Sequence, residues 1–278
     1  MTWVRFLFRH NRIGLVGALV LLFFISMALV PGLFAPHDPL EMYPAARMAP
    51  PDSQFPMGTD RYGRDILSRI AYGTRISVEV GILSVLVAAV IGSILGVVSG
   101  YFAGVTDYLI MRVMDTIFAF PSLLLAIALA AVAGAGLKSV IIAIGIVYTP
   151  IFARVARAPT LSVKEQEFVV AAQSIGASTL RILRLHILPN ILTPIIVQMA
   201  LSLSGAIVVE AALSFLGLGA TPPTPSLGSM LSEGRAFMEL APWTVLYPGL
   251  ALALLILSVN LFGDAVRDML DPRQRSEL

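Results

Sequence analysis

The side chains that could carry out chemistry are few in this sequence, and their spacing fits no common catalytic or metal-binding motif. There is no cysteine, and the three histidines, His10, His37 and His186, are too far apart to form a metal-ligand motif. No HExxH or GxSxG motif occurs, and the polar loop at 58–65 (GTDRYGRD) contains no specific nucleophile–base pair. No GxxxxGKS/T motif occurs either, so the chain lacks a phosphate-binding loop of its own for ATP. The sequence predicts a chain with no catalytic residue and no bound metal or cofactor.

One acidic residue, Glu210, lies deep inside a long apolar stretch, GAIVVEAALSFLGLG. A carboxylate facing hydrocarbon is costly, so this side chain must face a cavity, a polar partner or the interior of a helix bundle. Glu210 is therefore a candidate residue of a translocation path. The alternative is a hydrogen-bonded packing residue between helices, and the sequence leaves both interpretations open.

The surrounding sequence is far more apolar than a soluble protein of this length. Of 278 residues, 57% are hydrophobic and 13% are charged, whereas about 25% of the residues of a soluble domain are charged. The net charge of +2 and the absence of a basic block do not indicate a nucleic-acid partner. Six stretches with few or no charges are long enough to cross a bilayer as helices, namely 13–34, 80–104, 116–137, 139–156, 187–218 and 244–263. The sequence predicts an all-α polytopic membrane protein with six transmembrane helices.

The distribution of Lys and Arg orients these helices. Basic residues are more numerous on the side that carries both termini, which indicates that both termini are cytoplasmic. The first apolar stretch is too long for a signal peptide, so we expect it to be retained. The predicted regions are a cytoplasmic N-terminus (1–12), a first helix (13–34), a periplasmic loop (35–79), a transmembrane core (80–263) that includes a cytoplasmic loop (157–187), and a cytoplasmic C-terminus (264–278).

Small residues recur at every fourth position of the second stretch, from Ser84 to Gly104, and form overlapping GxxxG units. Spacing of four places them on one helix face, where another backbone can approach closely. That approach serves either packing within the chain or contact with a second subunit.

Residues 168–190 (FVVAAQSIGASTLRILRLHILPN) predict a compact helix–turn–helix in the cytoplasmic loop between helices four and five. Phe168, Ala172 and Ile175 recur at the spacing of one helix face. Gly176 then breaks the helix.

A second short helix is predicted to follow the glycine. Ser178 can cap a helix that begins near Thr179. Leu180, Leu183 and Ile187 continue an apolar face, and Pro189 closes the unit. An exposed helix pair with an apolar face is suited to docking in a groove of a partner. The alternative is a hairpin that folds back on its own bundle, and periodicity alone does not separate the two.

The same segment resembles the EAA loop of the inner-membrane permeases of ATP-binding-cassette (ABC) importers. The residues at the matching positions are Ala171, Ala172, Gly176, His186, Leu188 and Pro189. The glutamate that names the loop is absent, and Val170 occupies its position. Four further stretches are similar to the dipeptide, oligopeptide and nickel branch of this family, and to the C-type permease, the second of its two permeases: 55–77, 111–130, 210–231 and 260–273.

The resemblance implies a type I ABC importer permease fold, in a bacterial inner membrane, with a cytoplasmic coupling helix–turn–helix. It implies that this chain forms half of a pore with a second, homologous permease, surrounded by membrane lipid. Two ABC ATPase subunits would bind ATP and Mg²⁺, and a periplasmic or lipid-anchored binding protein would deliver the solute. The residues expected to couple to the ATPase subunits are Phe168, Val170, Ala171, Ala172, Ile175, Gly176, Ala177, Leu180, His186 and Pro189.

The cargo implied by the resemblance is a dipeptide or oligopeptide, with nickel complexes, glutathione or opines as alternatives. A more distant alternative is a secondary transporter or channel. That class predicts ionisable or helix-breaking residues at matching positions of two inverted halves, and no such repeat is evident in the sequence.

Overall fold

The computed structural model describes residues 12–270 of the chain. This part is helical, and its one strand-like feature is an isolated bridge between Thr59 and Asp65. The helices are α2 (Arg12–Leu29), α3 (Ile66–Phe102), α4 (Gly104–Phe118), α5 (Ser122–Ala133), α6 (Leu137–Val163), α7 (Glu167–Ser174), α8 (Thr179–Ile182), α9 (Leu188–Phe215), α10 (Leu227–Gly234) and α11 (Trp243–Leu270). Short helical turns are η1 (Pro31–Leu33), η2 (Pro44–Ala46), η3 (Leu183–Ile187, of π type) and η4 (Arg235–Phe237).

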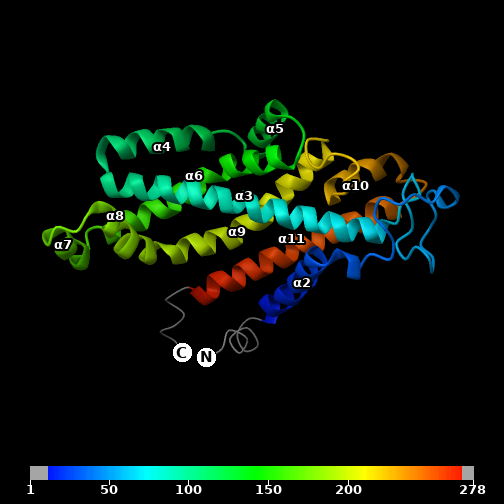
Figure 1. Ribbon diagram of the computed structural model, residues 1–278, viewed down its shortest axis with the longest axis horizontal. Coiled ribbons are helices and arrows are strands. Elements are labelled where there is room, and N and C mark those ends of the chain that lie inside the picture. The colour runs from blue at the N-terminus through cyan, green and yellow to red at the C-terminus, as the bar shows by residue number, and fades with distance from the viewer. Residues whose placement is uncertain (1–11, 271–278) are drawn as a thin grey trace.

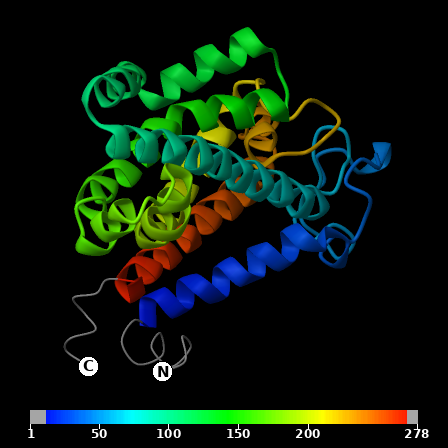
Figure 2. The same ribbon diagram turned by 60° about the vertical axis from the view of Figure 1, so that its left-hand side comes forward.

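The long helices α3, α6, α9 and α11 run along the molecule and pack side by side (Figure 1). Helices α7 and α8 lie at one end of this bundle. Helix α10 and the loop between α2 and α3 lie at the other end. Helix α2 packs on α11 and on α3 (Figure 2). The two ends of the bundle are therefore separate regions, as expected for the two sides of a membrane.

Four helical segments in the described chain are long and apolar enough to cross a membrane: α3, α6, α11 and the continuous stretch Thr179–Phe215. The pair α4 and α5 would supply a fifth if it forms one bent span. The apolar part of α2, Ile13–Leu29, is shorter than a typical span. The all-helical membrane fold is confirmed, and the count of six spans stays a prediction.

Helix α3 begins at Ile66, well inside the range 35–79 that we expected to be a loop. Asp65 caps it by accepting a hydrogen bond of 2.9 Å from the backbone N–H of Ser68. The hydropathy pattern concealed this extension because it contains charged residues, among them Arg69. That arginine is 1% exposed and is neutralised by ion pairs, so its charge does not mark a loop.

The predicted third span, 116–137, is not one continuous helix. Helices α4 and α5 meet at 92° across a short break. Pro121 lies at the N-cap of α5, and a proline lacks the backbone N–H that would continue the preceding helix and also disfavours helical geometry in the residue before it. Helix α4 starts at Gly104, and its charges, including Asp107 and Asp115, kept it outside the predicted apolar stretch.

The small residues of α3 serve close packing within the chain. A Cβ atom on Gly92 would lie 2.5 Å from the carbonyl oxygen of Thr149, and one on Gly96 would lie 2.2 Å from that of Ala153. Both distances are far below van der Waals contact, so α6 approaches α3 at a separation that larger side chains forbid. The first of the two interpretations of this stripe is therefore confirmed.

The buried apolar residues form two clusters. The larger lies among α3, α5, α6 and α9, includes Ile144 and Leu213, and extends to Val169 of α7. The second joins α2 to α3, α10 and α11 and includes Phe24 and Leu255. The cytoplasmic hairpin predicted from the sequence is therefore attached to the same core as the long helices that flank it.

Candidate functional site

Helices α7 and α8 form the helix–turn–helix that the sequence predicts. Helix α7 ends at Ser174, and α8 begins at Thr179 with Ser178 at its N-cap, although the Ser178 side chain makes no capping hydrogen bond. Gly176 closes the turn with φ +80°, and its N–H donates to the carbonyl of Gln173 at 2.9 Å. This left-handed conformation is favourable only for glycine and, to a lesser degree, Asn or Asp. The position of the break is therefore confirmed.

Most residues predicted to couple to a partner lie on the outside of this hairpin. Ile175 and Leu180 are 86% and 63% exposed. His186 and Ala177 are partly exposed, and Ala172 is buried. The remaining exposed members are Phe168, Val170, Ala171, Gly176 and Pro189. The hairpin thus presents an apolar surface at the end of the molecule.

The predicted shared face of Phe168, Ala172 and Ile175 is wrong in one respect. Ala172 faces the protein interior, whereas Phe168 and Ile175 face outward. Helix α7 has only two turns, and Ile175 is its C-cap with φ −87° and ψ 9°, so the i+7 position is already outside the helix. The helical spacing therefore does not extend to Ile175, although Phe168 and Ala172 both lie within α7.

Three residues attach the hairpin to the bundle, and the sequence analysis singled out one of them, Ile187, as part of an apolar face. Val169, Ile182 and Ile187 are at most 1% exposed and belong to the core cluster of α3, α6 and α9. The signal that could have found Val169 is its i, i+3 spacing to Ala172 on the inner face of α7. The hairpin therefore combines both interpretations: one side packs on its own bundle, and the other side is exposed.

Val170 occupies the exposed side of α7, where its side chain is 48% exposed. Replacement of the usual glutamate by valine removes a surface charge and leaves no buried group unpaired. Nearby, the rings of Phe168 and His186 lie 5.9 Å apart, which links α7 to the π-helical turn that leads into α9. The carbonyl of His186 accepts a hydrogen bond of 2.6 Å from the Asn190 side chain.

Polar contacts fix the segment that leads into the hairpin. Arg157 Nε and Nη2 each donate to Asp107 of α4 at 2.6 Å, and Ser99 of α3 donates to the same carboxylate. Lys164, next to the end of α6, donates to the carbonyl of Gly100 at 2.9 Å. These contacts join the turn between α3 and α4 to the end of α6, directly before α7.

Glu210 is fully buried in α9, and both of its carboxylate oxygens have partners. Ser77 Oγ of α3 donates to Oε2 at 2.7 Å, and Ser214 Oγ, one turn along α9, donates to Oε1 at 2.7 Å. These contacts satisfy a buried carboxylate and join α9 to α3, as the packing interpretation requires. Contact between Glu210 and a transported solute stays a prediction.

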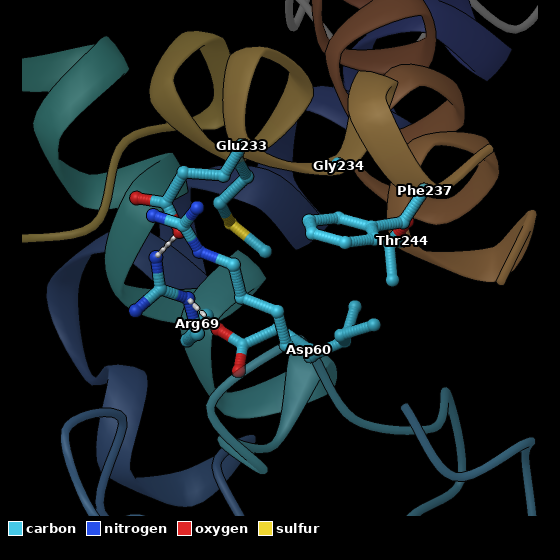
Figure 3. A pocket seen from close by; sticks show the side chains of 9 residues that line it. Asp60, Arg69, Glu233, Gly234, Phe237 and Thr244 are labelled. Carbon is cyan, nitrogen blue, oxygen red and sulfur yellow. Dashed lines mark hydrogen bonds and ion pairs between the residues drawn. The ribbon is translucent and has the colours of Figure 1, made fainter. Parts of the chain in front are cut away.

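Two buried arginines tie the loop before α3 to α10 at the opposite end of the molecule. Arg64 lies 2.6 Å from Asp60 and 2.7 Å from Glu233. Arg69 lies between the same two carboxylates, 3.6 Å from Asp60 and 3.3 Å from Glu233 (Figure 3). A small cavity beside this network is also lined by Phe237 and other residues of the α10–α11 region. The partner Glu233 was missed because no sequence spacing connects residues so far apart in the chain.

The described residues hold no group of three or more His, Asp or Glu side chains placed to bind a metal ion.

Two family comparisons cover nearly the whole chain. Residues 92–276 match the family described as the binding-protein-dependent transport system inner membrane component. Residues 2–51 match the family described as the N-terminal TM domain of oligopeptide transport permease C.

Several curated relatives align with this chain along most of their length. The dipeptide transport system permease protein DppC of Alkalihalophilus pseudofirmus is 44% identical, and the alignment covers 96% of this chain and 88% of that protein. The protein of the same name from Haemophilus influenzae is 43% identical, with 93% of it covered by 96% of this chain. The glutathione transport system permease protein GsiD of Pectobacterium atrosepticum is 42% identical, with 91% of it covered by 99% of this chain.

Among solved structures, an inward-facing form of the MetNI methionine ABC transporter is similar in fold. The TM-score is 0.58 at 17% identity, and the match covers 73% of this chain and 96% of the other. The type I permease fold expected from the sequence is thereby confirmed. The chain therefore belongs to the family of binding-protein-dependent transport system inner membrane components, the permease subunits of ABC importers.

Proposed function

We propose that this chain forms one half of the pore of an importer for dipeptides or other short peptides. In this proposal the hairpin α7–α8 docks on an ATPase subunit. It transmits the movements of that subunit during ATP binding and hydrolysis to the pore. The observation that supports it best is the exposed apolar side of the hairpin, made by Phe168, Val170, Ile175 and Leu180. An apolar helix surface suits a groove in a partner protein. Because the other side of the hairpin belongs to the core of α3, α6 and α9, displacement of the hairpin would move those helices.

Dipeptides are the proposed cargo because relatives named for dipeptide transport are 42–44% identical over almost the whole chain. Glutathione is the second candidate, since relatives named for glutathione transport reach the same identity. Glutathione is itself a short peptide, so both candidates share a backbone with charged ends. Nickel complexes and opines are less supported by these relatives.

The proposed complex contains a second, homologous permease, two ATPase subunits that hold ATP and Mg²⁺, and a binding protein on the outer side. This chain has no catalytic role in the proposal, because nucleotide hydrolysis occurs in the ATPase subunits. Both termini are cytoplasmic, so that α7 and α8 face the ATPase subunits. Glu210 holds α9 against α3 inside the wall of the pore.

Uptake by the complete complex tests the proposed function. The complex is reconstituted in proteoliposomes with its binding protein, and accumulation of labelled alanyl-alanine and of labelled glutathione is measured with and without ATP. ATP-dependent accumulation of either is expected, and the larger of the two identifies the cargo. Absence of ATP-dependent uptake of both would contradict a peptide importer.

A matched pair of substitutions tests the docking role of the hairpin. Leu180 at the hairpin and Leu240 at the opposite end are similarly exposed, at 63% and 69%. Leu180→Asp is expected to reduce the amount of ATPase subunit that co-purifies, because a charge would be buried in an apolar contact. Leu240→Asp is expected to retain the ATPase subunits. Equal retention by the two variants would show that the hairpin does not dock through this face.

A further inference from the structure

A wide polar groove lies between α4 and α6, in the half of the bundle that carries the hairpin. It is open on one side and has a volume of ≈ 450 Å³. Its lining residues are Gly104, Asp107, Tyr108, Met111, Arg112, Asp115, Arg154 and Arg157. Five of these eight residues are charged, which is unusual for a surface formed by two helices of a membrane protein.

The charges of both signs alternate across the groove. Asp115 of α4 and Arg154 of α6 form an ion pair of 2.7 Å, with side chains that are 55% and 43% exposed. Nearer the hairpin, Asp107 pairs with Arg157 at 2.6 Å. Arg112 lies over the ring of Tyr108 at 5.5 Å, and its Nη2 donates to the Tyr108 hydroxyl at 3.3 Å. The groove therefore presents acidic and basic groups along the same wall.

Helix α4 separates this polar side from an apolar one. Tyr108, Met111 and Asp115 recur at helical spacing on the side of the groove. Leu109 and Val113, which are 58% and 56% exposed, are outside the groove lining. Their two-residue offset from Met111 places them on the other side of the helix. Only that apolar side is suited to hydrocarbon.

The Asp115–Arg154 pair lies away from the hairpin end of both helices. Asp115 lies roughly 16 Å along α4 from Gly104, at about 1.5 Å of rise per residue. Half-exposed ionised side chains within candidate membrane-spanning segments are tolerated only where they face water or protein. The groove must therefore be either filled with water or covered by a partner chain.

We propose that this groove is the water-filled inner segment of the translocation path, and that it takes a zwitterionic solute such as a peptide with free termini. The proposal rests on the proposed import function. The lining holds two carboxylates and three guanidinium groups, so both charged ends of such a solute can find a group of opposite sign at the same time, whereas an ion of one sign can use only part of the lining. Opposite charges already paired across the groove also keep binding weak, which suits a passage that must release its solute.

Cysteine labelling tests the proposal directly, because the chain has no native cysteine to remove. Met111→Cys places a thiol in the groove, and Val113→Cys places one at nearly the same depth on the other side of α4. Tyr108→Cys is a second groove position, should Met111→Cys fail to assemble. Each variant is prepared as the complete complex in nanodiscs, shown to retain peptide uptake in proteoliposomes, and treated with the charged reagent methanethiosulfonate ethylsulfonate.

The groove cysteine is expected to react at least about tenfold faster than the cysteine at 113, because a charged reagent does not enter hydrocarbon readily. Its modification is expected to abolish ATP-dependent peptide uptake. Reaction of Met111→Cys and Tyr108→Cys no faster than Val113→Cys would overturn the proposal, since lipid or a partner chain would then cover the groove. Rapid modification without loss of uptake would overturn it too, because the groove would be wet but outside the path. In both cases peptide uptake by the complex before labelling is measured separately. It therefore tests the import function independently of the groove.

Discussion

Asp107 of α4 and Arg157 of α6 form a two-point ion pair, with both guanidinium contacts at 2.6 Å. Ser99 donates a further hydrogen bond to the same carboxylate. The pair connects the first half of a broken helix to the last turns of α6, the segment that continues into the hairpin. It is therefore placed to carry hairpin movement to the helix that lines the polar groove.

Removal of this ion pair should have a small effect on the stability of the fold and a larger effect on the coupling between ATP hydrolysis and peptide uptake. For Asp107→Ala we expect a loss of stability of about 1 kcal/mol, because the pair is partly exposed to solvent. We expect ATPase activity to persist while ATP-driven peptide uptake falls. The double variant Asp107→Arg/Arg157→Asp is expected to recover part of the uptake. Asp115→Ala removes the more exposed pair and is the comparison for stability, where a smaller loss is expected. An equal loss of stability in both variants would contradict a larger contribution from the Asp107–Arg157 pair.

Substitution at Gly176 separates backbone conformation from bulk. A Cβ at Gly176 would meet no atom within 4 Å, so the constraint at this position is its φ of +80°. Gly176→Trp is expected to prevent ATPase docking or uncouple transport while the helices still insert. Gly176→Asn is expected to be nearly normal, because asparagine tolerates this conformation. Co-purification of ATPase subunits and uptake are measured for both, and full activity of Gly176→Trp would contradict the assigned role.

Restoration of the absent glutamate at position 170 tests what the partner surface presents there. Val170→Glu is expected to leave the melting temperature of the isolated permease unchanged, because the side chain is exposed. Docking is expected to weaken by about tenfold, because the charge would be placed against a surface matched to valine. Val170→Ile is the apolar control. Tighter binding of the ATPase subunit by Val170→Glu would show instead that the groove keeps a basic partner for the carboxylate.

The two interpretations of Glu210 predict different outcomes for Glu210→Gln. As a packing residue, glutamine can still accept from one of Ser77 and Ser214 and donate to the other, so stability and uptake should both be nearly retained. Glu210→Ala leaves two buried hydroxyls without their acceptor and should cost about 1–3 kcal/mol for each. Thermal denaturation and peptide uptake are measured in parallel. Loss of uptake in Glu210→Gln with unchanged denaturation would favour contact with the solute.

Glu233 should stabilise the end of the molecule that carries α10. Glu233→Ala removes the carboxylate shared by Arg64 and Arg69, and Arg69 is 1% exposed, so the expected loss is about 3 kcal/mol, the lower range for breaking a buried pair. Glu239→Ala, an exposed glutamate in the same region, is the matched control and should change the melting temperature little. A similar melting temperature for both variants would show that Asp60 alone neutralises the two arginines.

Local features of the chain were predictable from the sequence because they depend on neighbours in the chain. Apolar length predicts helices in a membrane, Gly176 marks a turn that needs a left-handed residue, and Thr179 begins a helix after it.

The tertiary structure decided which groups meet. Ser77 and Glu210 are 133 positions apart, and Arg64 and Glu233 are 169 apart, so no periodicity could pair them. The sequence also could not show which side of the hairpin faces inward. Helix α7 is too short for its periodicity to decide this, and its orientation follows from the packing of Val169 in the core. Spacing along one chain describes the face of a single helix, whereas a contact between helices depends on how several faces pack together. That is why the helical membrane architecture was evident from the sequence, and the partners of its charged residues were not.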